Sequence, residues 1–180
     1  LFRGRGGNGF RDASSAARIV HDRFGQGIAV GDYDLDGFPD IYLSNFQSAV
    51  LLQNNGDGTF TDTSGRAGIA TDGWGSSAAF ADLDRDGILD IYVCCYLDDE
   101  LGVHDPCVYS YGRSYCGPAA RYGAQDLVWI GRGDGTFAES ARALGLDEES
   151  GNGKGLAVAV VDLDDDLVPE VYVGNDAQPN

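Results

Sequence analysis

Apolar and polar residues alternate along this 180-residue chain in short runs that aspartate, asparagine and glycine interrupt. Three apolar triplets rich in β-branched residues and tyrosine, at residues 41–43, 91–93 and 171–173, predict strands because turn-forming residues bound them. The 27 glycines are about twice the usual share, which favours many tight turns over long helices. No apolar run approaches the roughly 20 residues of a membrane-spanning helix. The pattern therefore predicts an all-β fold.

A nine-residue acidic pattern precedes each of the three triplets. The motif DxDxDGxxD occupies residues 32–40 and 82–90, and residues 162–170 repeat it with Leu167 in place of the glycine and Glu170 in place of the last aspartate. Four carboxylates in nine residues repel one another unless a hard divalent cation lies among them. The pattern predicts calcium loops, each of which joins two strands of a hairpin.

The predicted loops differ from an EF-hand, because the twelfth position of every copy is an apolar strand residue where an EF-hand needs a bidentate glutamate. We expect carboxylates from positions one, three, five and nine and a backbone carbonyl from position seven. Oxygen-only ligands suit Ca²⁺, whereas Zn²⁺ prefers the Cys and His side chains that these loops lack. A structural role is expected rather than a catalytic one, since every carboxylate is assigned to the ion. The alternative is that the aspartates form solvated turns. The predicted ligands are Asp32, Asp34, Asp36, Phe38 and Asp40 in the first loop, Asp82, Asp84, Asp86, Ile88 and Asp90 in the second, and Asp162, Asp164, Asp166, Val168 and Glu170 in the third.

A second motif, built around Gly-Asp-Gly-Thr-Phe, occurs at residues 51–62 and 128–139, with a weaker copy at residues 1–12. Its Asn-Gly and Asp-Gly dipeptides tolerate positive φ, so each copy predicts a hairpin. Asp32 and Asp82 are 50 residues apart, a spacing typical of propeller blades. Together the motifs predict four-stranded β-propeller blades, with strands at residues 28–30, 41–43, 50–53 and 59–62 in the first full copy.

The repeats predict that residues 1–180 form one β-propeller segment, which contains as many strands as three blades. The expected parts are the last two strands of a blade at 1–14, a blade at 24–63, a blade at 74–140 with a cysteine-rich insertion at about 94–126, and the first two strands of a blade at 155–180. Closed propellers have about four to eight blades. We therefore expect the blade split between the termini to be completed within a longer propeller or by another chain, which would close a ring or grow head to tail.

The inserted segment holds the four cysteines at its root and along its length, together with five of the nine tyrosines. The cysteines predict disulfide bonding in an oxidising compartment, with three possible connectivities. A bond between Cys107 and Cys116 is favoured, with Cys94 and Cys95 pairing with each other or with a neighbour. The rival is a zinc site of Cys107, Cys116 and His104, which lacks a CxxC spacing. The tyrosines suit a glycan or protein ligand, and the alternative is that they pack on the base of the loop.

Phe24-Gly25, followed by Ala29 and the acidic pattern from Asp32, resembles the FG-GAP or VCBS repeat of integrin-α-like β-propellers. With the Asn-Gly-Asp-Gly-Thr-Phe turn and the Tyr-Cys-Gly-Pro segment at 115–118, the chain is similar to the cartilage acidic protein family and its bacterial relatives. The resemblance implies a seven- or eight-bladed, usually secreted propeller with Ca²⁺ between the first two strands of a blade, and no shared catalytic activity. Lys154 departs from the pattern at the position of Phe24.

Charge and the remaining motifs narrow the function. A formal net charge of −17 argues against nucleic acid as a partner. Residues 4–9 fit GxGxxG and residues 132–134 spell Arg-Gly-Asp, but both align with the hairpin turn, so neither predicts a dinucleotide or adhesive site. His21 has no nucleophile motif beside it.

These observations predict a calcium-stabilised propeller segment that is secreted, extracellular, on the cell surface or periplasmic. Its expected role is binding, adhesion or scaffolding, with a protein or glycan partner contacted by loops on the blade frame. One alternative is a structural subunit that assembles head to tail by strand completion. Another is part of a polysaccharide-active enzyme.

Overall fold

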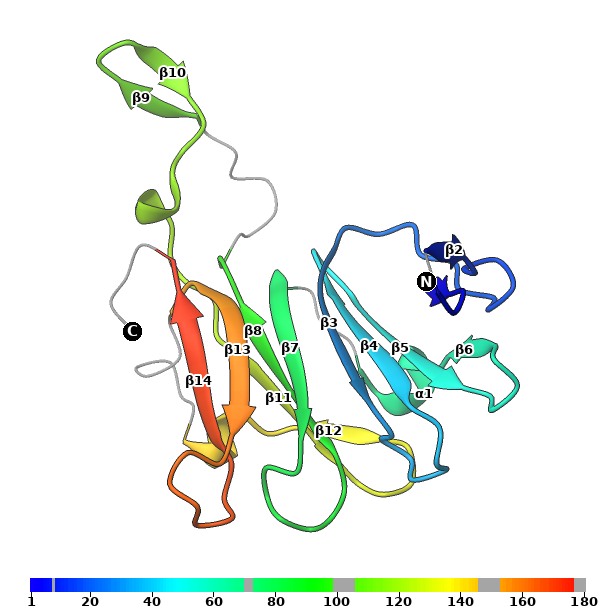
Figure 1. Ribbon diagram of the computed structural model, residues 1–180. Helices are drawn as coiled ribbons and strands as arrows, with labels where there is room; N and C mark the ends of the chain where they lie inside the picture. The colour runs from blue at the N-terminus through cyan, green and yellow to red at the C-terminus, as the bar shows by residue number, and fades with distance from the viewer. Residues whose placement is uncertain (8, 70–72, 99–105, 146–152, 177–180) are drawn as a thin grey trace.

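Two four-stranded antiparallel sheets form the body of the molecule (Figure 1). The computed structural model describes residues 1–7, 9–69, 73–98, 106–145 and 153–176. The first sheet pairs β3 (Gly25–Gly31), β4 (Asp40–Asn45), β5 (Ala49–Asn54) and β6 (Phe60–Asp62) in chain order. The second pairs β7 (Gly75–Ala81), β8 (Asp90–Cys95), β11 (Leu127–Gly131) and β12 (Phe137–Glu139) in the same way. The all-β prediction is confirmed, and both sheets have the strand arrangement of propeller blades.

Three two-stranded hairpins accompany the sheets. They are β1 (Phe2–Gly4) with β2 (Phe10–Asp12), β9 (Cys107–Tyr109) with β10 (Gly112–Ser114), and β13 (Gly155–Val161) with β14 (Glu170–Asn175). In the described part of the chain, helical structure is limited to short turns, namely α1 (Ser64–Ala67), η1 (Pro118–Ala120) and η2 (Arg142–Leu144). Over the described ranges, none of these helical turns is long and apolar enough to cross a membrane.

The β8 strand is buried on both faces and joins two hydrophobic cores. Its side chains alternate in direction, as in any strand, so that Ile91 and Val93 enter the core shared with Leu51 of the first sheet. Tyr92 and Cys94 enter a second core that faces the β13–β14 hairpin. The strand therefore lies in the middle of the stack of sheets, which explains its continuous run of apolar residues.

Neighbouring sheets approach closely along their first strands. A Cβ atom on Gly27 of β3 would lie 2.6 Å from the Cα of Ser77 on β7, so a side chain there would force the two backbones apart. The amide of Gly27 donates to the Ser44 hydroxyl at 3.0 Å. The Ser76 hydroxyl donates to the carbonyl of Gly155 on β13 at 2.6 Å. Because β3, β7 and β13 meet in this way, the sheets stack as blades do around a common axis.

The cysteines depart in part from the prediction. Cys107 and Cys116 are bonded to each other, as expected, with their Cα atoms 5.0 Å apart. Cys94 and Cys95 are free and buried, so the prediction that they form disulfides is wrong. They are the last two residues of β8 and point to opposite faces of the strand, into different cores. The excursion between the blades thus begins after Cys95 and ends before β11.

The two ends of the stacked sheets differ. The turns β3–β4, β7–β8 and β13–β14, which carry the acidic motifs, lie together at the lower end in Figure 1. The β9–β10 hairpin projects from the opposite end. The repeated acidic motifs and the inserted segment are therefore separated by the length of the strands.

Candidate metal centres

The first acidic loop is held in shape by its own carboxylates. The amides of Asp36 and Gly37 donate to the Asp32 carboxylate at 3.1 and 2.9 Å, and the amide of Phe38 donates to Asp36 at 2.8 Å. The amide of Tyr33 donates to Asp40 at 3.1 Å. These bonds wrap the backbone around the side chains of positions one and five, as a cation-binding loop requires.

The other two loops repeat this geometry. Position six donates to position one through Gly87 to Asp82 at 3.0 Å in the second loop and through Leu167 to Asp162 at 2.8 Å in the third. Position seven donates to position five in both, with distances of 2.8 and 2.7 Å. Because an altered copy keeps the pattern, the loop geometry belongs to the repeat and not to one sequence.

Two positions in every loop have left-handed backbone. Position six is left-handed at Gly37 and Gly87, with φ of 89° and 88°, and also at Leu167, with φ of 68°. Position four is left-handed as well, although no glycine occupies it in any copy; the residues are Leu35, Arg85 and Asp165, with φ of 59°, 67° and 62°. The sequence revealed the first position through its glycines and gave no signal for the second.

Three carboxylates in each loop lie close enough to share one ion. The groups are Asp32, Asp34 and Asp36, then Asp82, Asp84 and Asp86, then Asp162, Asp164 and Glu170, and in each group the oxygens lie within 4.8 Å of one another. The structure thus brings together most of the predicted carboxylate ligands. Asp40, Asp90 and Asp166 are outside these groups. The predicted carbonyl ligands at Phe38, Ile88 and Val168 stay predictions.

The ninth carboxylate of the two intact loops braces the blade. Asp40 and Asp90 are fully buried. Besides the amide at position two, Asp40 accepts from the amide of Asn54 at 2.7 Å and Asp90 from that of Gly131 at 2.9 Å. Each carboxylate therefore ties the acidic loop to the turn after the third strand, which links the two repeated motifs. Sequence reasoning assigned these residues to the ion and missed this link.

Burial makes these bracing carboxylates hard to ionise. It is the main cause that raises the pKa of Asp40 to about 6, and the charges of Asp34 and Asp36 raise it further. Burial likewise raises the pKa of Asp90. Buried carboxylates are normally paired or bound to metal. A cation in the loop would reverse the repulsion from Asp34 and Asp36.

One carboxylate oxygen in the second loop is placed where a cation could bind it. The Oδ1 atom of Asp82 is buried and has no hydrogen-bond partner, whereas the corresponding Asp32 Oδ1 accepts an amide. An unpartnered buried oxygen is costly. Hard oxygen donors without Cys or His are the ligand set of Ca²⁺, so the residues present fit that ion.

The first loop has a link that the second lacks. The side-chain amide of Gln53 donates to Asp34 at 2.5 Å, and its oxygen accepts from the Arg66 guanidinium at 2.8 Å. The position equivalent to Gln53 in the second sheet is Ile130, since each precedes the residue whose amide binds the ninth carboxylate. Only a non-polar side chain is therefore available at that position of the second loop.

The motifs that we discounted behave as turns. The amide of Arg132 donates to the Thr136 carbonyl at 3.0 Å, and the Thr136 amide and hydroxyl both donate to Asp134. Those bonds lower the pKa of Asp134, the Thr136 hydroxyl most of all. At the glycine-rich motif, β1 pairs with β2 up to Gly4 and Phe10, and the Arg5 amide donates to the Gly9 carbonyl; Asn8 lies outside the described residues. His21 lies 2.7 Å from the side-chain oxygen of Asn45.

The alternative prediction of a zinc site is wrong for two of its three ligands, because Cys107 and Cys116 form a disulfide with each other. The third predicted ligand, His104, lies outside the described residues. Cys94 and Cys95 are not available ligands either. Burial raises the pKa of Cys94 and raises that of Cys95 to about 12. Thiols of this kind are inert at neutral pH.

Stacked four-stranded antiparallel sheets with an acidic loop after the first strand define a class of propeller-type repeats. Comparison with known families agrees: the FG-GAP-like repeat matches residues 32–93. The matched residues run from the first acidic loop into β8, and the match supports an FG-GAP repeat family. No curated protein matches the chain. The similarity to the cartilage acidic protein family stays a prediction.

Proposed function

We propose that this chain is a calcium-stabilised, extracellular propeller module for binding, adhesion or scaffolding, in which the repeated loops hold the frame and the inserted segment contacts the partner. The observation that carries the proposal is the shared geometry of three acidic loops at one end of the sheets. An FG-GAP-like repeat is typical of such modules, and the match at residues 32–93 supports this assignment.

Calcium would be held by the three carboxylates of each group, with loop carbonyls and water completing its shell. The bound ion would supply charge neutralisation and would cross-link backbone segments that otherwise carry only like charges. Three ions would also reduce the formal charge from −17 to −11. The benefit is structural, because loops anchored by an ion keep the blades in register.

A binding role is proposed rather than a catalytic one. The loop carboxylates accept hydrogen bonds from backbone amides of their own loops. Groups engaged in this way are poorly placed as acids or bases, which need to reach a substrate proton. Secretion or surface display is proposed because the Cys107–Cys116 disulfide suits an oxidising compartment.

Calcium stoichiometry tests this function. Calorimetric titration of the metal-stripped chain should show up to three ions, and Asp84→Asn should remove or weaken one of them. Asp98→Asn is the matched control, because Asp98 is an exposed acid outside the loops. Equal calcium binding by both variants and the parent chain, or no calcium binding at all, would overturn the proposal.

Assembly by strand completion is a second candidate function. Phe2 and Phe10 of the β1–β2 hairpin are 71% and 73% exposed, and Leu156 and Tyr172 of the β13–β14 hairpin are about half exposed or more, at 50% and 58%. Apolar side chains that are exposed to this degree commonly mark contact surfaces. Light scattering should show concentration-dependent association, whereas a monomer at all micromolar concentrations would contradict it.

A further inference from the structure

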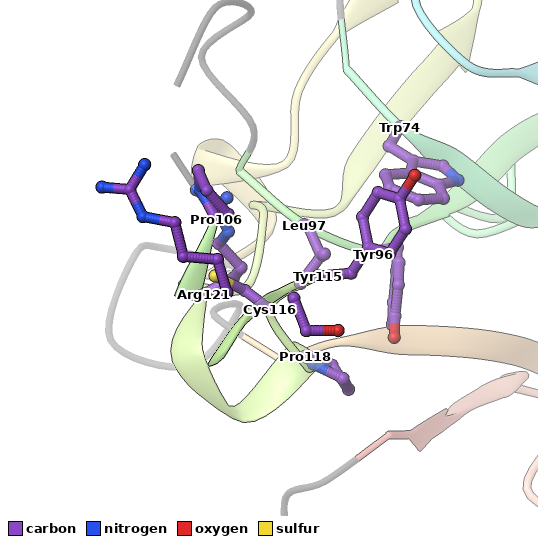
Figure 2. A pocket seen from close by; sticks show the side chains of 10 residues that line it. Trp74, Tyr96, Leu97, Pro106, Tyr115, Cys116, Pro118 and Arg121 are labelled. Carbon is purple, nitrogen blue, oxygen red and sulfur yellow. The ribbon is translucent and has the colours of Figure 1, made fainter. Parts of the chain in front are cut away.

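The inserted segment and the blades enclose a pocket of about 750 Å³ at the end opposite the acidic loops (Figure 2). Its volume lies in the range of small-molecule and sugar-sized sites, roughly 300 to 1,000 Å³. Trp74, just before β7, and Tyr96, just after β8, line one side, while Arg113, Tyr115 and Arg121 come from later in the inserted segment. No metal loop contributes to it.

The blade side of the pocket is a rigid aromatic floor. Trp74 packs edge-on against Phe46 at 5.2 Å and against Tyr96 at 5.1 Å between ring centroids. The Tyr96 amide donates to the Trp74 carbonyl at 2.9 Å, and the Tyr96 hydroxyl donates to Asp176 at 2.6 Å. Phe46 directly follows β4, Trp74 precedes β7, Tyr96 follows β8 and Asp176 follows β14. The floor is thus built where the two full sheets and the β13–β14 hairpin meet, and these contacts hold its rings in place.

The opposite wall is a hairpin closed by a disulfide. The Cys107–Cys116 bond ties the ends of β9 and β10 together, and Tyr115 beside it is 95% exposed. Tyr109 and Tyr111 stack with ring centroids 5.2 Å apart and nearly parallel planes. In Figure 2, Arg121 lies across the pocket from Trp74 and Tyr96. The pocket therefore has aromatic surface on the blade side and cationic side chains on the hairpin side.

The lining of the pocket contrasts in charge with the composition of the chain. Among the residues that the structure describes, two basic and no acidic side chains line the pocket, although the net charge of the chain is −17. Asp176 accepts the hydroxyl of Tyr96, a residue of the floor. The acidic loops begin at the far end of β8, six residues long, which separates them from the pocket by roughly 17 Å. That distance exceeds the Debye length of about 8 Å at physiological salt.

From this juxtaposition of an aromatic floor and the Arg113 guanidinium we infer that the pocket binds an acidic sugar unit of a glycan. Flat rings suit the apolar face of a sugar ring, while the Ser114 and Tyr115 hydroxyls of the lining suit its hydroxyl groups. A guanidinium pairs with a carboxylate or sulfate in bidentate fashion. A bounded pocket of this size fits one or two ring-shaped units better than an extended acidic peptide. The inference rests on the proposed binding function and names its ligand class.

The probes that test it are trigalacturonic acid, the neutral galactose trisaccharide and tetraglutamate, each titrated in calcium against the full chain. We expect binding of the acidic trisaccharide, at least about tenfold weaker binding of the neutral one, and binding that falls as salt rises. Arg113→Ala should weaken binding by about tenfold or more, since it removes charge-assisted hydrogen bonds. Arg132→Ala, which removes an exposed arginine at the β11–β12 turn, should leave binding unchanged.

Two results would overturn the inference: equal binding of the acidic and neutral sugars, or preference for tetraglutamate, which would identify an acidic peptide site. Absence of binding to all three probes by a calcium-loaded, cooperatively melting chain would overturn it as well. Arg113→Lys separates charge from geometry, because partial recovery is expected for an anion held through a guanidinium. Calcium stoichiometry measured on the same samples shows whether the proposed frame holds, so the two proposals fail separately.

Discussion

The two ends of the blades are built on different principles. The lower end repeats one loop three times, with the same amide-to-carboxylate bonds at Gly37, Gly87 and Leu167. The upper end has a single inserted segment, which lines a pocket together with Trp74. Repetition indicates a frame, because each copy solves the same local problem of crowded charge. A unique, disulfide-closed feature indicates specificity, because nothing in the frame requires it. Variants and conditions that act on one end should therefore leave the other unchanged.

Removing calcium should have the largest effect, and it acts on the lower end. On the proposed function, each site would stabilise the fold by about 4 kcal/mol when free calcium is 1,000 times the dissociation constant, because an empty loop keeps like charges a few ångströms apart. Excess chelator should therefore lower the melting temperature strongly, as followed by circular dichroism. An unchanged melting curve would show that the frame does not depend on the loops.

Opening the disulfide should affect only the upper end. The double variant Cys107→Ser, Cys116→Ser releases a loop constraint worth roughly 3 kcal/mol in the unfolded hairpin. Because β9 and β10 pair with each other and not with the blades, this loss should appear as local opening. Hydrogen exchange should rise over residues 106–118 and binding of the acidic sugar should fall, while calcium binding and melting stay the same.

A joint loss of calcium binding and sugar binding in that variant would show that the two ends are coupled. The matched control is Cys95→Ser, which places a hydroxyl in the core shared by the two sheets. This change should lower the melting temperature without a specific increase in exchange at the hairpin, since it disturbs packing and leaves the disulfide intact.

Much of the lower end was predictable, for a physical reason. Strands expected at 28–30, 41–43, 50–53 and 59–62 lie in or across β3 to β6, because short-range alternation and glycine turns determine them. The bracing role of Asp40 was not predictable, since its second bond reaches Asn54, fourteen residues away. The prediction that Cys94 and Cys95 form disulfides was wrong because it rested on the number of cysteines, whereas the alternation of side chains along a strand places the two in separate cores. The aromatic floor is tertiary: Phe46 and Trp74 meet only when blades stack.

Within the lower end, the third loop should bind calcium more tightly when glycine replaces the leucine at position six. Leu167 has a left-handed φ of 68°, which costs a residue with a Cβ roughly 1 to 2 kcal/mol. Leu167→Gly should therefore tighten calcium binding at one site by about that amount if calcium is what enforces the turn, as measured by calorimetry. Gly37→Ala is the reverse test and should weaken the first site. Unchanged affinity in both would mean that the turn forms equally well in the empty loop.

The Gln53 link should make the first loop bind calcium more tightly than the second. Its amide fixes Asp34 in place, so Gln53→Ala should weaken the first site by roughly 1 kcal/mol, the usual net value of such a bond. Ile130→Val, a small change at the equivalent position, should leave the second site unaltered. Equal affinities in the parent chain, or no change in Gln53→Ala, would remove the proposed difference.

The smallest effect expected is a pH dependence at the root of the inserted segment. Asp126 is buried and accepts from the Tyr92 hydroxyl and the Cys95 amide, both at 2.7 Å. Burial raises the pKa of Asp126 above its ordinary value of 3.8 despite those bonds. The folded state therefore holds the proton more tightly than the unfolded state, so the stabilisation is complete below pH 3.8 and is lost as the pH rises through the raised value. Asp126→Asn cannot titrate. At fixed calcium, the free energy of unfolding of the parent chain should fall relative to that of the variant as the pH increases from 4 to 7. A difference that moves in the parent's favour would mean that the two hydrogen bonds outweigh burial, and that the charged carboxylate is what holds β8 to the inserted segment.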